Sequence, residues 1–274
     1  MKIIAILTLW ALFAACPAGA SQDVPAFAAL EEACGYIREQ VEAMDGQIRL
    51  ILPRAAWLEE RPVMDDRGEQ GVFDLEDSIW NLIYLFPDMY RLAYGYTELG
   101  EDVRVTLWPE YRFSARCLDA IANGRTDALS NDEYAAMNKA LMLAGIAREE
   151  RDMEAVERRA ALLLCEHVTF AEPEGQTDTE AEDPRSGLCA LLHGKANCQG
   201  YADAFCLIAN LCGLECRIVT GWTADGVSHV WNRLALPAPH DADVTLMDTG
   251  DTPDMRYLPI EQDILNQRRL MTLR

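Results

Sequence analysis

A cysteine and a histidine whose neighbours would activate a thiol lie in the last third of the 274-residue sequence. Cys198 directly precedes a stripe of side chains at helical spacing, formed by Tyr201, Phe205, Ile208 and Cys212 and followed by Gly213. The free backbone N–H groups and the positive dipole end at a helix start stabilise a thiolate. The same groups can hold a developing oxyanion. Cys198 is therefore the predicted nucleophile.

A base and an orienting acid follow Cys198 along the chain. Residues 215–220 and 227–236 are predicted strands, and the second contains His229, with Trp231 on the same face. A third predicted strand, residues 244–248, ends on Asp248. An imidazole beside the thiol could take its proton, and a carboxylate could fix the imidazole tautomer. The sequence thus predicts a catalytic triad of Cys198, His229 and Asp248.

Two alternative residues remain for these roles. Asp243 is a second candidate acid, but it begins the third strand from a turn, and an orienting carboxylate must be held still. Asp248, at the rigid strand end, is therefore preferred. His193, five residues before Cys198, is a rival base in a predicted loop where nothing orients it.

No metal or cofactor site is predicted. The sequence contains no Cys-x-x-Cys, and Cys206, Cys212 and Cys216 are spaced unlike a zinc finger or ribbon. A Cys-His-Asp triad needs no cofactor. The composition also excludes other classes of partner, because 24 basic and 45 acidic residues give a net charge of −21. Such a surface repels phosphate backbones, so nucleic-acid binding is not expected.

Four stretches together resemble the core of the bacterial transglutaminase-like superfamily in residue type, order and spacing. They are Gly194-Lys195-Ala196-Asn197-Cys198-Gln199-Gly200-Tyr201-Ala202, residues 213–221, His229-Val230-Trp231-Asn232 and Met247-Asp248-Thr249. The resemblance covers about residues 187–258. It implies a papain-like α+β fold, with one helix packed on an antiparallel sheet, and a triad carried by Cys198, His229 and Asp248.

The sequence departs from that family at two places. Residues 237–243 stand where the family often has a Gly and a Trp before its Asp, and Asp243-Val244-Thr245 also resembles the family's Asp-x-Thr. No Gln lies a few residues before Cys198 to donate to an oxyanion as in papain. Backbone N–H groups would have to serve instead.

The elements that position these residues follow from local patterns. A first helix is expected within residues 25–44 with a left-handed stop at Gly46, and a second over residues 75–86 is ended by Pro87. Residues 90–97 and 103–111 form a predicted hairpin, which with Phe86-Pro87 weakly resembles a module that often precedes the transglutaminase-like core.

Two further helices are marked by their caps. Ser130 and Glu133 form a predicted capping box for a helix to about Arg148, and Asp152 caps one to about Val168. Residues 171–185 mix acidic side chains with Pro, Gly and Thr, which predicts a mobile loop. That loop is either a surface insertion without a role or a lid that guides substrate.

The first residues predict export. Lys2 precedes an apolar run over residues 3–15, and Ala18-Gly19-Ala20 offers small residues to a signal peptidase, so the mature chain would start near Ser21. A short buried helix is the alternative. Phe13-Ala14-Ala15-Cys16 resembles a lipobox, so lipid anchoring through Cys16 is a further alternative. Of nine cysteines, most are expected to be small buried hydrophobes.

The sequence therefore predicts an α+β protein with a signal peptide (1–20), a helical region with a β-hairpin (21–170), an acidic flexible loop (171–186) and a transglutaminase-like catalytic core (187–274). The predicted function is an exported thiol-dependent acyl-transfer enzyme, a cysteine peptidase or amidase. Its partners would be peptide or protein substrates, cell-wall peptide among them. The alternatives are a protein-crosslinking transglutaminase and an inactive surface module that binds peptides.

Overall fold

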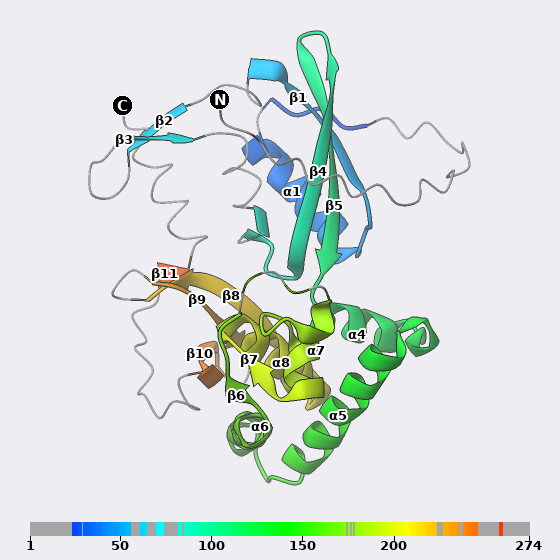
Figure 1. Cartoon of the computed structure of the whole chain (residues 1–274), viewed down its shortest axis with the longest axis vertical. Helices are drawn as coiled ribbons and strands as arrows, with labels where there is room; N and C mark the ends of the chain where they lie inside the picture. The colour runs from blue at the N-terminus through cyan, green and yellow to red at the C-terminus, as the bar shows by residue number, and fades with distance from the viewer. Residues whose placement is uncertain are drawn as a thin grey trace.

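The computed structural model of the chain describes most of the residues between Val24 and Thr245 (Figure 1). The described residues are 24–28, 30–55, 61–64, 70–73, 82–83, 85–173, 175, 177, 179–223, 227–235, 238–245 and 258–259. The predicted signal peptide, Cys16 and Asp248 lie outside them. None of the helices within this part of the chain has the length and apolar character needed to span a membrane.

The N-terminal module is a three-stranded antiparallel sheet packed on one helix (Figure 1). The sheet has the order β1-β5-β4, with β1 at Ile48–Pro53, β4 at Met89–Leu99 and β5 at Asp102–Tyr111. Alternate residues of β5 are buried, and they form one apolar core with Ile37 of α1, which spans Leu30–Glu42. A separate two-stranded ribbon joins β2, Arg61–Met64, to β3, Gln70–Phe73.

The second half contains five helices and an antiparallel sheet, and α8 is the helix that packs on the sheet. The helices are α4 (Phe113–Ala122), α5 (Asn131–Ala147), α6 (Met153–His167), α7 (Gly187–His193) and α8 (Cys198–Leu211). The sheet has the order β10-β9-β8-β11, with strands Cys216–Trp222 (β8), Ser228–Leu234 (β9), His240–Ala242 (β10) and Leu258–Pro259 (β11).

Short elements lie between these helices along the chain. They are the 3-10 helices η1 (Thr126–Ala128) and η2 (Glu180–Glu182) and the parallel pair β6 (Thr169–Phe170) and β7 (Lys195–Ala196). Helix α8 lies at the centre, because every residue from Gly200 to Ala209 is buried. The predicted α+β class, with a helix packed on an antiparallel sheet, is confirmed.

The local patterns predicted most of these elements. The hairpin of β4 and β5 is present, with Gly100 at φ 79° in its turn. Helix α5 begins with the full capping box of Ser130 and Glu133, and the Asp152 side chain accepts the N–H of Ala155 at the start of α6. Of the predicted helix over residues 75–86, the described residues 82, 83 and 85 are helical.

Several expectations were wrong. Helix α1 ends through Met44, at φ 56°, and not through Gly46, because the N–H groups of Met44 and Asp45 bond back to the last turn. His193 is the last residue of α7 and not a loop residue. The start of the catalytic core at residue 187 stays a prediction; α4, α5 and α6 share one apolar core with α8.

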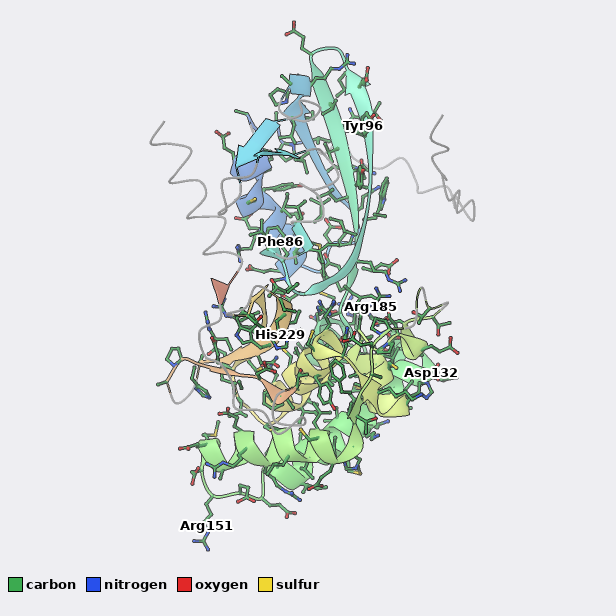
Figure 2. All side chains as sticks on the ribbon, turned by 60° about the vertical axis from the view of Figure 1, so that its left-hand side comes forward. Phe86, Tyr96, Asp132, Arg151, Arg185 and His229 are labelled. Carbon is green, nitrogen blue, oxygen red and sulfur yellow. The ribbon has the colours of Figure 1, made fainter. Side chains whose placement is uncertain are left out.

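The second half of the predicted mobile loop contains a buried, hydrogen-bonded carboxylate. Asp183 is fully buried, and its carboxylate accepts hydrogen bonds from Tyr90 and from Arg185, whose Nε lies 2.9 Å from Oδ1. Because Tyr90 belongs to β4, this contact ties the N-terminal module to the second half. Arg185 and His229 both lie in that half, on its side nearer the three-stranded sheet (Figure 2).

Candidate active site

The start of α8 holds Cys198 in place through a capping asparagine. Asn197 is extended, at φ −93° and ψ −170°, and its Oδ1 accepts the N–H groups of Gln199 at 3.0 Å and Gly200 at 3.4 Å. Cys198 is thus the first helical residue, as predicted, and its side chain is partly exposed. The positive end of the helix dipole therefore acts directly on the thiol.

The backbone packs very closely behind this cysteine. A Cβ at Gly200 would collide with the carbonyl oxygen of Pro184 and lie 2.9 Å from the Cβ of Ala196. The same carbonyl of Pro184 accepts the N–H of Asn197 at 2.9 Å. Only glycine fits at position 200. The close contact of this glycine with residues 184–186 therefore fixes where the first turn of α8 lies.

His229 is bound on two sides. Its Nε2 lies 2.6 Å from Oδ2 of Asp243, and its side chain also forms a hydrogen bond with Cys198. The ring plane is inclined by only 15° to that of Trp231, with centroids 6.3 Å apart, so the two residues share a face as predicted. Burial lowers the pKa of His229, but the bonds and charges of Asp243 and Cys198 raise it to about 9.

The carboxylate that meets His229 is that of Asp243, directly after β10. Its residue is only 3% exposed, and its Oδ1 accepts the N–H of Thr245 at 3.1 Å. Val244 and Thr245 are helical, so the predicted strand over residues 244–248 is wrong at its start. The expectation that Asp243 lies in a flexible turn is also wrong, because its side chain accepts a backbone N–H of the helical residues that follow. Asp248, which the sequence favoured, lies outside the described residues.

The sequence profile of the transglutaminase-like superfamily matches residues 142–244, which include Cys198, His229 and Asp243. The chain contains a transglutaminase-like core. The matched region begins within α5 and ends directly after Asp243. It therefore starts well before residue 187, where the sequence places the start of the core.

Solved structures resemble the chain weakly. A TGase crystal structure is matched over 85% of this chain and 62% of its own length, with 13% identity and a TM-score of 0.40. A candidate cysteine protease from Cytophaga hutchinsonii is matched over 62% of this chain and 66% of its own length, with 10% identity and a TM-score of 0.37.

A candidate protease from Parabacteroides distasonis is matched over 69% of this chain and 37% of its own length, with 8% identity and a TM-score of 0.32. The chain thus spans less than two thirds of the length of each of these three structures. None of the curated proteins matches the chain.

The transglutaminase-like core brings only one of the four histidines to Cys198. His193 is exposed at the end of α7, and His167 bonds through Nδ1 to the carbonyl of Leu163 at 2.7 Å. His240 pairs through Nε2 with Glu157 at 2.8 Å. The rival base His193 therefore has no described contact with the thiol. Within the described ranges, no cluster of three or more His, Cys, Asp or Glu side chains could hold a metal ion.

A buried carboxylate on α8 binds the starts of two neighbouring helices. Asp203 is fully buried, and its oxygens accept the N–H of Ser114 at 3.0 Å and the N–H of Gly187 at 2.8 Å. These two N–H groups belong to the first turns of α4 and α7. A negative charge at two helix starts is stabilised by both dipoles, so Asp203 fixes three helices together. Sequence analysis missed it, since no local pattern distinguishes it from a surface acid.

A second missed residue contacts the neighbour of Cys198. Arg112 is 2% exposed, its Nε donates to the carbonyl of Pro87 at 2.6 Å, and its Nη2 lies 3.4 Å from Oε1 of Gln199. The residue that precedes α4 therefore connects the N-terminal module to the first turn of α8. Asn197 was also missed as a positioning residue, although an Asn directly before an apolar helical stripe is a preferred N-cap.

Proposed function

We propose that this protein is a thiol-dependent acyl-transfer enzyme in which Cys198 attacks an amide carbonyl. The observation that carries the proposal is the placement of the His229 imidazole between the Asp243 carboxylate and the Cys198 thiol. A thiol nucleophile needs a base within hydrogen-bond reach and a third group that orients the base. These three side chains supply that set.

The pKa of His229, at about 9, decides the resting charges. At neutral pH the imidazole is protonated, so Nε2 donates to Asp243 and the other ring nitrogen faces the sulfur as a donor. A neighbouring imidazolium and the positive end of a helix dipole both stabilise a thiolate, which is the form of cysteine that attacks a carbonyl.

The reaction then proceeds in two halves. The thiolate adds to the carbonyl carbon, and His229 gives its proton to the amine as the C–N bond breaks, which leaves a thioester on Cys198. In the second half, neutral His229 takes a proton from the incoming nucleophile. The nucleophile displaces the sulfur, the thiolate is regenerated, and His229 is again protonated.

The oxyanion of each addition step would be held by backbone. The Asn197 side chain accepts the N–H groups of Gln199 and Gly200, whereas no described residue accepts the N–H of Cys198 itself. That N–H lies on the same residue as the nucleophile and at the positive end of α8. It is the donor available to a tetrahedral oxyanion.

Water is the proposed nucleophile of the second half, which makes the enzyme a peptidase or amidase. Its substrates would be peptides or cell-surface amides, met after export through the predicted signal peptide. An amine as the acceptor would make it a protein-crosslinking transglutaminase instead. The charge of −21 favours substrates that carry positive charge.

Two measurements on the purified chain test the proposal. Brief labelling with iodoacetamide at neutral pH, followed by mass mapping, should modify Cys198 before the other thiols. A fluorescent unfolded protein should be hydrolysed, and Cys198→Ala and His229→Ala should each abolish this activity while Cys212→Ser retains it. The buried Cys212 bonds to the carbonyl of Ala144 at 3.7 Å and controls for loss of a thiol.

The same assay separates the alternatives. A fluorescent primary amine that becomes coupled to the protein substrate, without release of peptides, would identify a crosslinking enzyme. Binding of peptides by both the native chain and Cys198→Ala, with no reaction in either, would identify an inactive binding module. First labelling of Cys206 or Cys216 would refute Cys198 as the activated thiol.

A further inference from the structure

Two buried thiols lie together where the second half of α8 meets the start of β8. Cys206 lies on α8, and Cys216 is the first residue of β8. The two side chains share a hydrogen bond, and Sγ of Cys206 lies 3.5 Å from the backbone carbonyl oxygen of Cys216. The residues are 5% and 8% exposed. No step of the proposed reaction uses either of them.

The Asn210 side chain forms hydrogen bonds with both cysteine residues and so fixes them next to each other. Its Nδ2 donates to the carbonyl oxygens of Cys206 and Cys216, at 2.8 Å each, and lies 3.5 Å from Sγ of Cys206. Its Oδ1 accepts the N–H of Cys216 at 3.4 Å. One side chain therefore fixes the end of α8 to the start of β8, and a bond between the two sulfurs would join elements that already touch.

We propose that Cys206 and Cys216 form a disulfide bond when the chain folds in the presence of a small-molecule disulfide such as oxidised glutathione. One thiolate of the pair attacks the reagent, forms a mixed disulfide and releases one glutathione thiol. The second thiolate attacks the protein sulfur of the mixed disulfide, forms the Cys206–Cys216 bond and releases the second thiol. The protein loses two electrons and two protons, and the reagent gains them.

The native surroundings favour closure during folding over closure afterwards. The hydrogen bond with Cys216, followed by burial, raises the pKa of the Cys206 thiol well above its ordinary value. The thiol is thus protonated and shielded in the folded protein, and only thiolates exchange. Refolding in the presence of the disulfide reagent exposes both thiols to it while they approach each other.

The proposed Cys206–Cys216 disulfide would not involve Cys198, the proposed nucleophile. Cys206 lies eight residues beyond Cys198, which is about 12 Å along a helix axis. A disulfide between α8 and β8 would restrain the short loop that connects them and stabilise the core. An enzyme with a reactive thiol could then fold in an oxidising compartment, where one pair is oxidised and Cys198 stays free. The proposal does not depend on any activity of Cys198.

The test refolds the full chain carrying Cys198→Ser, so that the candidate nucleophile cannot react. After refolding with a mixture of oxidised and reduced glutathione and quenching with iodoacetamide, digestion without reductant should yield a peptide pair joined through Cys206 and Cys216. Cys206→Ser and Cys216→Ser, each in this background, should lose the pair, and Cys212→Ser should keep it. The oxidised protein should melt higher than the reduced form, by on the order of 5 °C.

Three results would overturn the proposal. They are Cys206 and Cys216 both alkylated after oxidative refolding, a cross-link that joins either one to another cysteine, and a joined pair with an unchanged or lowered melting temperature. Because every sample lacks Cys198, none of these results depends on whether the chain is an enzyme. Conversely, if the chain that retains Cys198 proved inactive in the hydrolysis assay while the Cys198→Ser chain formed the disulfide, only the proposed function would be refuted.

Discussion

Nε2 of His229 lies 2.6 Å from Oδ2 of Asp243, while the other oxygen of that carboxylate accepts the N–H of Thr245. The carboxylate is thus held by the backbone on one side and orients an imidazole on the other. Both side chains are largely buried, at 12% and 2% exposure. An orienting acid needs such immobility, since its effect is to keep the imidazole in one tautomer and one position.

Asp243→Asn should lower kcat by about a hundredfold or more, because the amide cannot stabilise the protonated imidazole in the same way. Asp241→Asn is the matched control. Asp241 lies on β10 and pairs with Arg233, whose Nη2 lies 2.8 Å from Oδ2, so its loss removes a charge without touching His229. Steady-state kinetics, with circular dichroism to verify folding, compare the two. A near-normal rate in Asp243→Asn would return the role to Asp248.

Stability should depend on the charge of His229. Its pKa is raised from 6.5 in the unfolded chain to about 9 in the folded protein, so protonated His229 contributes full stability below about pH 6.5. That contribution is lost as the pH rises through about 9. The free energy of unfolding of the native chain minus that of His229→Gln should fall by at most about 3 kcal/mol between about pH 6 and pH 10. A difference that stays constant would contradict the raised pKa.

Local sequence patterns predicted the elements that carry Cys198 and His229. The N-terminus of α8 follows from a cysteine directly before an apolar stripe that ends at a glycine, and these signals act within a few residues. The capping box of Ser130 and Glu133 is equally local. Where the secondary structure around a residue is determined by its neighbours in the chain, the sequence alone predicts it.

Tertiary contacts decided the residues that sequence analysis misplaced or missed. Val244 has high strand propensity, yet it is helical, because the Asp243 side chain caps the backbone after it. Asp183 lies in an acidic, Pro- and Gly-containing segment typical of a mobile loop, yet Tyr90 and Arg185 bury it. Asp203 bonds to residues 16 and 89 positions away. No local pattern encodes such partners.

Asn197→Ala should reduce both stability and turnover. The variant loses the acceptor for the N–H groups of Gln199 and Gly200, which costs about 1 kcal/mol of unfolding free energy. It also loosens the turn that presents Cys198, so kcat should fall by roughly tenfold. Ser130→Ala removes a comparable cap from α5, far along the chain from the site, and should lower stability with kcat unchanged. Denaturant unfolding and kinetics on both variants provide the comparison, and equal effects on kcat would refute a positioning role for Asn197.

Gly200→Ala and Gly145→Ala should have opposite effects, although both glycines lie within helices. A Cβ at position 200 would collide with the carbonyl oxygen of Pro184, lie 2.9 Å from the Cβ of Ala196 and lie 3.1 Å from the carbonyl oxygen of Ser186. Two of these three atoms are backbone atoms and cannot rotate away. The first turn of α8 must therefore shift, which should cost about 1–3 kcal/mol and move Cys198 away from His229.

A Cβ at Gly145, within α5, has no atom within 4 Å, so alanine there should stabilise the helix by roughly 0.5–1 kcal/mol. Unfolding by urea, read by circular dichroism, gives both free energies, and iodoacetamide labelling of Cys198 shows whether the thiol has lost its imidazole. Slower labelling is expected in Gly200→Ala only. Native stability and a native labelling rate in Gly200→Ala would contradict the prediction. They would show that the close packing of α8 against Pro184 does not position Cys198 beside His229.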